Sequence, residues 1–301
     1  MPKKIIVTTG DPNGIGAEVT KKALKGFDRS RFVVISNSKI IEYPDVEIPL
    51  EGDVEPSKIT KVGGEFSYQC LKKACELAKT GEYSAIVTAP VAKEAMHLAG
   101  HKFSGQTEVL ELFLAKDGQK AEMLFVARDF RVLLLTRHVA LKSISLDVDT
   151  VIKKISNLNS FLAEKLNIES PRLALCAFNP HAGENGLFGS EEIEILYPAI
   201  EILRKRGINI SKPLPADTLF IEAGKSYLKG ENVPYDCYIA CYHDQGLIPI
   251  KTVASDSTVN TTIGLDIIRT SPAHGTAFDI AGKNLADESS MVEAIKQALL
   301  Y

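Results

Sequence analysis

The sequence predicts an α/β fold in which helices cover a mostly parallel sheet. Two observations lead to this prediction. Short β-branched, apolar runs alternate along the chain with longer segments of helical periodicity. The 301 residues also suit two domains of about 150 residues each, which is long enough for substantial cores. Ligands in such folds bind beyond the carboxyl ends of the strands, so those positions are where functional side chains are expected.

The order of the elements follows from the same patterns. Lys4–Thr8 is expected to be a strand, followed by a glycine-rich turn and a helix over Ala17–Leu24. Glu65–Lys79 has the apolar spacing of an amphipathic helix, and Gly81 follows as a stop signal. The further strands are expected over Arg31–Ile35, Ser84–Thr88, Met123–Ala127, Arg131–Thr136, Arg172–Ala177 and Asp236–Cys241, and the further helices over Val151–Leu166, Glu191–Arg206 and Ser290–Leu300.

Two connections carry additional information. Met123–Ala127 and Arg131–Thr136 are joined so tightly that part of the sheet should be antiparallel. Pro44–Pro56 is rich in Glu, Asp and Pro and is expected to be a surface loop.

Composition excludes several classes of protein. The net charge of −3 and the isoelectric point near 6.1 argue against a nucleic-acid partner, because phosphate binders usually carry a basic face. Five cysteines without a C-x-x-C pair are typical of a reduced, cytosolic protein. The basic N-terminus has too short an apolar run for a signal peptide, and no segment approaches the roughly 18 apolar residues of a membrane span. The chain is therefore expected to be cytoplasmic, with no membrane partner.

Three histidines share one context, because each follows an apolar strand. They are His138 in LLLTRHVAL, His181 in ALCAFNPHAGE and His243 in IACYHDQG. Strands of one sheet deliver their ends to one edge, and three neutral imidazoles with an open position are typical of a catalytic divalent-metal site. Asp217 and Asp244 could supply a fourth ligand or orient an imidazole. The alternative is that each histidine only binds a backbone carbonyl at a strand end.

His97 and His101 have the four-residue spacing of a helical metal site. Gly100 lies between them and Lys102–Gly105 follows, so the helix should end there. We therefore expect these two side chains to lie on a solvated surface.

Two glycine-rich segments are candidates for ligand binding. TTGDPNGIGAE (8–18) joins a strand to a helix, where backbone N–H groups can meet an anion, but its glycines do not fit G-x-G-x-x-G. NTTIGLDIIRTSPAHGTAFDIAGKN (260–284) brings Arg269, His274 and Asp279 close together in sequence. With Lys251, Arg269 supplies two cations that suit a phosphate-bearing substrate, although Arg269 could also be a structural ion-pair partner.

A series of motifs resembles one family over residues 5 to about 285. In order they are TTGDPNGIGAE, AIVTAPVAKE, FSGQTEVL, LLLTRHVAL, NPHAGENGLFGSEE, PLPADTLF, YHDQGLIPIK and NTTIGLDIIRTSPAHGTAFDIAG. Together they closely resemble the 4-hydroxythreonine-4-phosphate dehydrogenases of pyridoxal phosphate (vitamin B6) biosynthesis. HGTAFDIAGK also resembles the cofactor loop of isocitrate and isopropylmalate dehydrogenases. The resemblance implies their fold: two α/β/α sandwich domains with a cleft between them, placed here at 1–137 plus 270–301 and at 138–269.

The resemblance implies an oxidation that depends on NAD or NADP and on a divalent metal such as zinc, magnesium or cobalt. The substrate would be 4-phosphooxy-L-threonine, and the product, 2-amino-3-oxo-4-phosphooxybutanoate, would decarboxylate to 3-amino-2-oxopropyl phosphate. The enzyme would be a homodimer with its active site at the interface and with metal ligands contributed across it.

The resemblance also assigns roles to individual residues. His138, His181 and His243 would bind the metal, while Asp217 and Asp244 would keep the site in order. Substrate contacts carry over to Gln106, Thr107, Lys251, Asn260 and Arg269. The adenosine half of the cofactor is expected against His274, Gly275, Thr276, Ala277, Asp279 and Asn284. The general base stays open between Lys251, Asp244 and a metal-bound hydroxide.

One position departs from the family pattern. The family usually shows Gly-His-Thr-Glu where this chain has Gly105-Gln106-Thr107-Glu108. Glutamine forms neutral hydrogen bonds but cannot be a cation near neutral pH. Binding of an anionic substrate group should therefore be weaker here, or the substrate should differ. The chain also looks shorter than the family around residues 40–60.

Other functions are compatible with the same residues. A dehydrogenase of a related four-carbon aldonate 4-phosphate would use the same site. A metal-dependent hydrolase or lyase would keep the three histidines but would have no use for HGTAFDIAGK. A third alternative is a non-catalytic regulatory protein that binds a small molecule.

Overall fold

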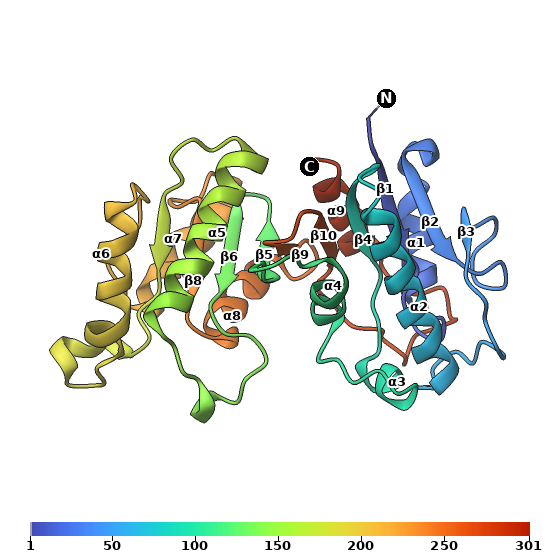
Figure 1. The fold of residues 1–301 in the computed structure, drawn as a ribbon, viewed down its shortest axis with the longest axis horizontal. Helices are drawn as coiled ribbons and strands as arrows, with labels where there is room; N and C mark the ends of the chain where they lie inside the picture. Colours follow the sequence, from blue (N-terminus) through green and yellow to red (C-terminus); the bar gives the residue numbers. More distant parts are fainter. Residues whose placement is uncertain (1) are drawn as a thin grey trace. The chain divides into compact units, whose positions relative to one another are not determined.

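The computed structural model describes residues 2–301, which form two compact units. The first unit contains the residues up to Ala121 together with Val259–Tyr301, and the second is Glu122–Thr258. In Figure 1 the end of the chain, drawn in red, returns to the unit in which the chain began. There β10 (Ile268–Pro272) pairs with β4 (Tyr83–Thr88).

The sheet of the first unit has the strand order β3-β2-β1-β4-β10-β9. All its neighbouring strands are parallel except β9, which runs antiparallel to β10. The remaining strand bounds are β1 Lys4–Thr8, β2 Phe32–Ser36, β3 Val46–Glu47 and β9 Val259–Ile263. Parallel pairing places the carboxyl ends of β1, β4 and β10 at one edge of the sheet, where ligands of α/β proteins bind.

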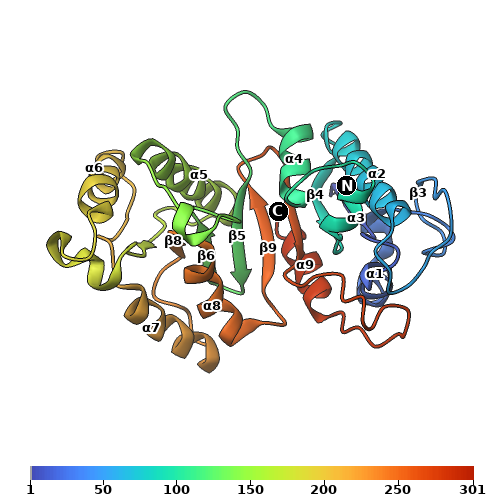
Figure 2. The ribbon, with the colours of Figure 1, turned by 90° about the horizontal axis from the view of Figure 1, so that it is seen from below.

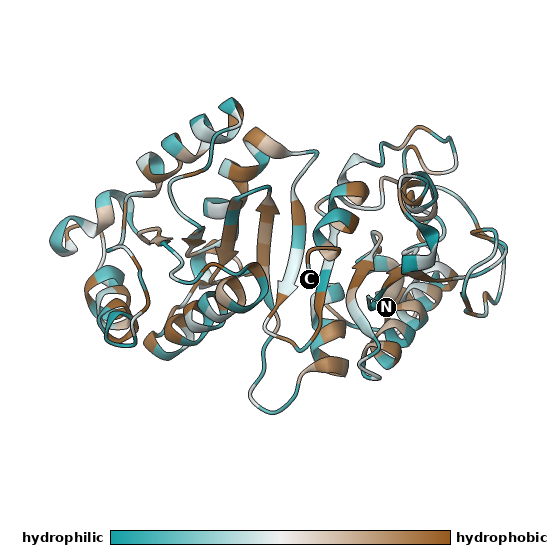
Figure 3. Ribbon diagram, turned by 90° about the horizontal axis from the view of Figure 1, so that it is seen from above, coloured by the Kyte–Doolittle hydropathy of each residue, from teal (hydrophilic) through white to brown (hydrophobic). Residues whose placement is uncertain are grey.

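Side chains of these strands alternate between two helical layers. Ile5 and Val7 of β1 pack with α1 (Gly16–Leu24) and α9 (Ser289–Ala298), whereas Ile6 packs with α2 (Lys61–Ala78). The short helices α3 (Lys93–Leu98) and α4 (Gln106–Leu114) lie against α2. In Figure 3 the strands are largely brown and the helices mix brown with teal, as expected where helices cover both faces of a sheet.

The second unit has the strand order β5-β6-β8-β7. β5 (Glu122–Ala127) and β6 (Phe130–Leu134) are antiparallel, while β6, β8 (Cys237–Ala240) and β7 (Leu173–Leu175) are parallel. Figure 2 shows α5 (Val148–Leu166) and α6 (Tyr197–Lys205) on one side of these strands, and α7 (Ala216–Lys229) and α8 (His243–Ala254) on the other. The predicted α/β fold and its antiparallel part are therefore confirmed.

The short helical segments complete the chain. They are the 3-10 turns η1 (Arg29–Arg31), η2 (Leu141–Ser143) and η3 (Pro180–Gly186), and the π-helical turn η4 (Glu192–Leu196). The helix expected over Glu191–Arg206 is thus divided into η4 and α6. The divide falls between Leu196 and Tyr197, just before Pro198, which has no N–H for a helical hydrogen bond.

The unit boundaries differ from the expected domains of 1–137 plus 270–301 and 138–269. Strand pairing gives the reason. β6 pairs with β8, so β5 and β6 belong to the second unit, and β9 pairs with β10, so the chain from Val259 onward belongs to the first.

Two further observations concern the described residues. All five cysteines are buried free thiols, in agreement with the expectation of a reduced protein. Among residues 2–301, no helix combines the length and the apolar character that crossing a membrane requires.

Candidate active site

The three strand-end histidines lie at one edge of the second unit. His138 follows β6, His243 follows β8 and His181 follows β7, and these strands are parallel neighbours in the order β6-β8-β7. The rings of His138 and His243 lie 5.6 Å apart between centroids. The sheet topology therefore brings two of the three imidazoles into direct proximity.

His243 is the first residue of α8, and not part of a post-strand loop as its sequence context suggests. Its Nδ1 donates to Oδ1 of Asp244 at 2.7 Å. A hydrogen bond from Nδ1 to a carboxylate leaves the Nε2 lone pair as the ligating atom, which is the usual arrangement behind a metal-binding histidine.

Gly246 determines how closely α8 approaches the sheet. A Cβ atom at this position would lie 2.7 Å from Cγ1 of Val132 and 2.8 Å from Cβ of Ala240. Only glycine therefore allows the first turn of α8, with His243, to pack against β6 and β8.

Gln245 connects the ends of two strands that lead to histidines. Its Oε1 accepts from the backbone N–H of Cys241 at 2.7 Å, and its Nε2 donates to the carbonyl of Ala177 at 2.7 Å. Cys241 directly follows β8, and Ala177 lies in the segment that leads from β7 to His181. Sequence reasoning missed this role, although glutamine in the first turn of a helix is a recognised capping signal.

His181 lies in a left-handed turn. The φ angles of residues 181–185 are 52°, 55°, 77°, 40° and 57°, and only Gly183 among them lacks a side chain. Left-handed backbone costs roughly 1–2 kcal/mol for each residue that has a Cβ, so the surrounding structure must hold the turn in place.

Asn179 and Glu192 hold this turn. The backbone N–H of Asn179 donates to Oε1 of Glu192 at 2.7 Å, and its Nδ2 donates to Oε2 at 2.9 Å. Glu192 is buried, with only 1% of its surface exposed. Strain concentrated at one loop, and held by a buried carboxylate, indicates a functional segment.

His181 also faces a small pocket of the second unit. The pocket has a volume of about 240 Å³ and is lined by Ala177, Phe178, Asn179, Pro180, His181, Ala216, Asp217, Tyr242 and Gln245. It therefore brings together His181 and Asp217, two of the residues expected in the site. Asp217 lies in the first turn of α7.

The expected metal ligands thus form two pairs: His138 with His243, and His181 with Asp217. Among residues 2–301, no group of three or more His, Cys, Asp or Glu side chains is arranged to hold a metal ion. The chemistry of the donors suits zinc or a similar ion.

Lys251 lies on α8, about two helical turns beyond His243. Burial lowers the pKa of its ammonium group. A lysine in this condition releases its proton more readily than a solvated one.

In the first unit, Arg269 is a buried cation near the start of β10, and its side chain reaches the carboxyl end of β4. It is 3% exposed, and its Nε donates to Oγ1 of Thr88 at 2.7 Å. Burial lowers the pKa of its guanidinium to about 9, while the negative charge of Glu108 raises it. A guanidinium with this pKa is still charged near pH 7.

Gln106 and Thr107 are the first two residues of α4. Nε2 of Gln106 donates to the carbonyl of Ala89 at 3.2 Å, and its buried Oε1 has no hydrogen-bond partner within the described chain. Thr107 is buried, with 3% exposure. Thr88 contacts Arg269 and Ala89 contacts Gln106, so two of the expected substrate residues have partners at the end of β4.

Asn260 lies on β9, opposite Ser271 of β10, and Arg269 lies opposite Thr262. Because side chains two residues apart on a strand share a face, Asn260, Thr262 and Arg269 point to the same side of the sheet. The buried Oδ1 of Asn260 and Oγ1 of Thr262 have no hydrogen-bond partner within residues 2–301. Such groups in an ordered protein indicate a position where a ligand or water is bound.

The expected cofactor loop packs against the glycine-rich turn. The backbone N–H of Ile15 donates to the carbonyl of Thr276 at 3.0 Å, and a Cβ on Gly14 would lie 2.9 Å from Cβ of Thr276. His274, Gly275 and Asp279 are exposed, and Ala277 and Asn284 have left-handed backbone with φ of 40° and 58°.

α1 holds the far end of this loop. Nζ of Lys22 donates to the carbonyls of Asn284 at 3.2 Å and Ala286 at 2.7 Å, and Glu18 accepts from the N–H of Ala286 at 2.8 Å. The two glycine-rich segments of the sequence thus form one surface at the carboxyl ends of β1 and β10.

Asp11 is a buried acid that sequence reasoning missed. It has no exposed surface, and Oδ1 accepts from the N–H of Asn13 at 3.0 Å while Oδ2 has no partner among the described residues. Burial raises the pKa of its carboxyl to about 6, although the backbone hydrogen bond from Asn13 lowers it. The signal available in the sequence was an aspartate inside the glycine-rich turn.

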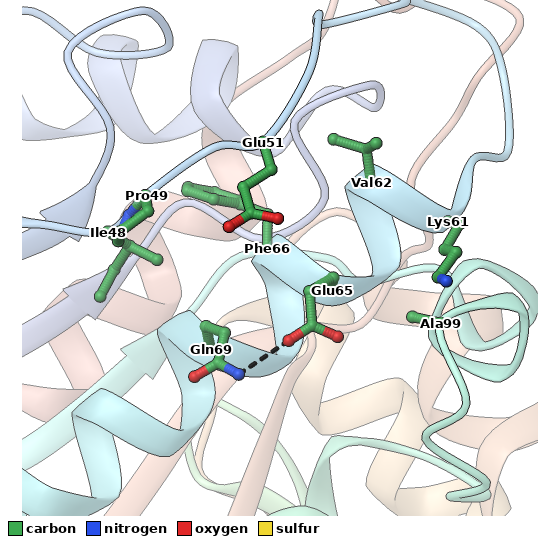
Figure 4. A pocket seen from close by; sticks show the side chains of 9 residues that line it. All are labelled: Ile48, Pro49, Glu51, Lys61, Val62, Glu65, Phe66, Gln69 and Ala99. Carbon is green, nitrogen blue, oxygen red and sulfur yellow. Dashed lines mark hydrogen bonds between the residues drawn. The ribbon is translucent and has the colours of Figure 1, made fainter.

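A larger pocket of the first unit contains none of the expected residues. Its volume is about 600 Å³, and Figure 4 shows its lining: Ile48, Pro49, Glu51, Lys61, Val62, Glu65, Phe66, Gln69 and Ala99. The carboxylate of Glu65 is engaged there by Nε2 of Gln69 at 2.7 Å.

His97 and His101 have local partners. α3 ends at Leu98, as expected, and Nε2 of His97 lies 2.9 Å from the carbonyl oxygen of Phe103. His101 is more enclosed than the surface position we expected. Its Nε2 lies 2.7 Å from Oε2 of Glu65, and its ring stacks on Tyr68 at 3.6 Å.

A family model described as pyridoxal phosphate biosynthetic protein PdxA matches residues 4–298. A 4-hydroxythreonine-4-phosphate dehydrogenase of Synechocystis is 38% identical, with coverage of 98% of this chain and 94% of the relative. A D-threonate 4-phosphate dehydrogenase of Cupriavidus necator is also 38% identical, over 94% of this chain and 81% of the relative.

Solved structures agree with this result. A crystal structure of 4-hydroxythreonine-4-phosphate dehydrogenase from Klebsiella pneumoniae matches with a TM-score of 0.83 and 34% identity, over 99% of both chains. An isocitrate dehydrogenase from Methylococcus capsulatus, at 13% identity and a TM-score of 0.51 over 99% of this chain and 85% of that one, shares the fold alone. The predicted fold class is confirmed, and the chain belongs to the pyridoxal phosphate biosynthetic protein PdxA family.

Proposed function

We propose that this protein is a dehydrogenase that oxidises the C3 hydroxyl of 4-phosphooxy-L-threonine with NAD⁺ or NADP⁺. A hydride passes from C3 to the nicotinamide, and the hydroxyl proton is released. The β-keto acid that forms, 2-amino-3-oxo-4-phosphooxybutanoate, then loses CO₂ and takes up a proton to give 3-amino-2-oxopropyl phosphate. The family, and the names of relatives such as the Synechocystis enzyme, support this reaction.

One observation supports the proposal most directly: a buried, charged Arg269 whose side chain reaches Thr88 at the carboxyl end of β4. A guanidinium recognises phosphate or carboxylate with paired hydrogen bonds. In the proposed site Arg269 binds one anionic end of the substrate. Thr107, Gln106 and Asn260 complete its hydrogen bonds, and Lys251 supplies the second cation.

The cofactor is proposed to lie on the surface formed by the glycine-rich turn and the loop that begins at His274. The hydrogen bond from Ile15 to Thr276 fixes these segments to each other. Exposed backbone at Gly275 allows close approach of an adenosine, because no side chain intervenes.

A divalent metal is proposed to be held by His138, His181 and His243. The observation that fits such an ion is the His243–Asp244 hydrogen bond, which fixes Nδ1 as the donor and Nε2 as the ligating atom. When bound, the ion would polarise the substrate hydroxyl and the ketone that forms from it. As the family resemblance implies, the complete set is proposed to draw on two subunits of a homodimer.

Proton transfer is assigned to Lys251 or Asp244. Lys251 is the stronger candidate, because burial lowers the pKa of its amine towards the working range of a general base. Asp244 is committed to His243 through Oδ1, and therefore acts first as an orienting group.

A second candidate function is the oxidation of D-threonate 4-phosphate, because a relative of that name is equally similar to this chain. The two substrates differ at C2, which carries an ammonium group in 4-phosphooxy-threonine and a hydroxyl group in threonate. A metal-dependent hydrolase or lyase is the candidate of another class.

NAD(P)H formation by the purified protein tests these alternatives. The absorbance at 340 nm is followed with each substrate and each cofactor, before and after removal of metal with EDTA. Reduction of a nicotinamide with 4-phosphooxy-threonine, lost with EDTA and restored by zinc or cobalt, supports the main proposal. Reduction only with D-threonate 4-phosphate selects the second, and product formation without a nicotinamide selects the hydrolase or lyase.

A further inference from the structure

Thr88 is the last residue of β4, and its hydroxyl accepts the hydrogen bond from Nε of Arg269 at 2.7 Å. Neither side chain is solvated, since Thr88 is 0% and Arg269 is 3% exposed. Thr88 is not among the residues expected in the site, and the proposed reaction does not use it directly.

Strand register explains why these two residues meet. β10 pairs with β4 in parallel, with Arg269 opposite Ile86. Thr88 lies two residues beyond Ile86 on β4. Its side chain therefore points to the same face of the sheet as Arg269 and lies closer to the carboxyl edge. The guanidinium therefore reaches along the sheet towards the edge where ligands bind.

The hydrogen bond selects which edge of the guanidinium can meet an anion. A guanidinium is planar and offers either the side edge, which includes Nε, or the end formed by its two terminal nitrogens. Thr88 occupies Nε, so a bidentate phosphate or carboxylate is received by the terminal nitrogens. The hydrogen bond to Thr88 thus restricts the orientation of the guanidinium.

We propose that Thr88 is a positioning residue for substrate recognition, which orients Arg269 towards the phosphate or carboxylate of the substrate without touching the substrate itself. This inference rests on the proposed function, in which Arg269 binds an anion.

The protein supplies a matched control. Thr8 of β1 lies beside Thr88 in the strand register and is equally buried, but its hydroxyl has no partner within residues 2–301. Replacing either threonine with valine removes a buried hydroxyl from the same layer of the sheet. Only Thr88→Val also leaves Nε of Arg269 without its acceptor.

The test measures the Kd of inorganic phosphate by titration of thermal unfolding. Phosphate is the probe because its binding does not depend on the carbon skeleton of the substrate. Thr88→Val should weaken phosphate binding at least five-fold, whereas Thr88→Ser and Thr8→Val should stay within two-fold of wild type. Thr88→Ala serves the same purpose if the valine variant does not fold. In an Arg269→Lys protein, which lacks Nε in this position, Thr88→Val should add less than a two-fold loss.

Unchanged phosphate binding in Thr88→Val or Thr88→Ala overturns the inference, as does a wild-type protein whose phosphate affinity does not depend on Arg269. Failure of the proposed function is a separate result. A wild-type protein that binds phosphate through Arg269 but oxidises neither candidate substrate contradicts the reaction and leaves the role of Thr88 intact.

Discussion

The imidazole rings of His138 and His243 lie 5.6 Å apart between centroids, at the ends of two neighbouring parallel strands. Neutral imidazoles are common ligands of divalent metals, and metal-ligand bonds to nitrogen are only about 2 Å long. We therefore expect His138→Ala, His181→Ala or His243→Ala each to lower bound metal and abolish turnover, with little change in the far-ultraviolet circular dichroism.

His97→Ala is the matched control for these variants, because its ring is engaged only locally by the carbonyl of Phe103. It should keep both metal and activity. Full activity of the His243→Ala protein would remove the metal assignment altogether.

The orienting role of Asp244 gives a prediction of its own. Asp244→Asn keeps the shape of the side chain but weakens the hydrogen bond that fixes the His243 tautomer. Loss of such a partner costs about ten- to hundred-fold in metal affinity. Competition with a fluorescent zinc chelator measures this affinity, and an Asp244→Asn protein that binds zinc as tightly as wild type would show that the carboxylate does not support the ligand.

Sequence reasoning was most successful where the periodicity was strong. The strand over Lys4–Thr8 was predicted with its observed bounds, and the tight antiparallel pair β5–β6 was expected from its short connection. α8 was not predicted, because Gly246 and Pro249 lie inside it and both disfavour a helix. Tertiary packing explains why a helix forms here despite these residues. Only glycine at position 246 allows α8 to pack closely against β6 and β8.

The candidate site was predictable to the extent that its chemistry resides in single residues. The histidines, Arg269 and the 274–284 loop carry recognisable side chains or motifs. Thr88, Gln245 and Asp11 were missed because their importance depends on partners distant in the sequence, such as Arg269 for Thr88 and Ala177 for Gln245. No local sequence pattern distinguishes a threonine that forms a hydrogen bond with a distant arginine from one that only packs within its strand.

The contact between Gly14 and Thr276 leads to a prediction about the cofactor. A methyl group on Gly14 would lie 2.8 Å from the carbonyl oxygen of Thr276, so Gly14→Ala should displace the loop. A methyl group on Gly275 would meet nothing within 4 Å, so a larger side chain there should disturb only a bound molecule. Both Gly14→Ala and Gly275→Val should raise the KM for NAD(P)⁺ more than the KM for the phosphorylated substrate.

Thermal unfolding separates the two effects, since Gly275→Val should retain wild-type stability in the absence of cofactor. If Gly275→Val raises only the KM of the phosphorylated substrate, the nicotinamide cofactor binds elsewhere.

Asp11 makes stability depend on pH. Burial raises the pKa of its carboxyl from 3.8 to about 6, so the folded protein retains a proton that the unfolded chain releases. The stabilisation is complete below pH 3.8 and is lost as the pH rises through about 6. At 1.36 kcal/mol for each pKa unit, the loss is roughly 3 kcal/mol.

Urea unfolding at pH 4, 5, 6 and 7 tests this expectation. Asp11→Asn removes the titrating group, so its free energy of unfolding should fall less between pH 4 and 7 than that of wild type. Parallel pH profiles for the two proteins would mean that Asp11 ionises as easily in the fold as in water.

Gln106 provides the sharpest test of the substrate site, because here the chain departs from the histidine usual in its family. The amide of Gln106 donates from Nε2 to the carbonyl of Ala89, so it offers a substrate anion at most a neutral hydrogen bond. A charged imidazolium could donate to Ala89 and to the anion at once. Hydrogen bonds to charged groups contribute about 1.5–3 kcal/mol against about 0.5–1.5 for neutral ones. Gln106→His should therefore lower the KM for 4-phosphooxy-threonine roughly five- to thirty-fold.

The gain should be largest below pH about 6.5, where histidine is charged. Gln106→Glu is the opposite control, since its carboxylate would repel both the substrate anion and the carbonyl of Ala89, and its KM should rise. KM values for 4-phosphooxy-threonine and D-threonate 4-phosphate across pH 6 to 8 distinguish two explanations of the glutamine. If Gln106→His improves 4-phosphooxy-threonine but weakens D-threonate 4-phosphate, the pocket is adapted to threonate. If wild type and Gln106→His show no pH-dependent difference with either substrate, position 106 does not contact an anionic group of the substrate.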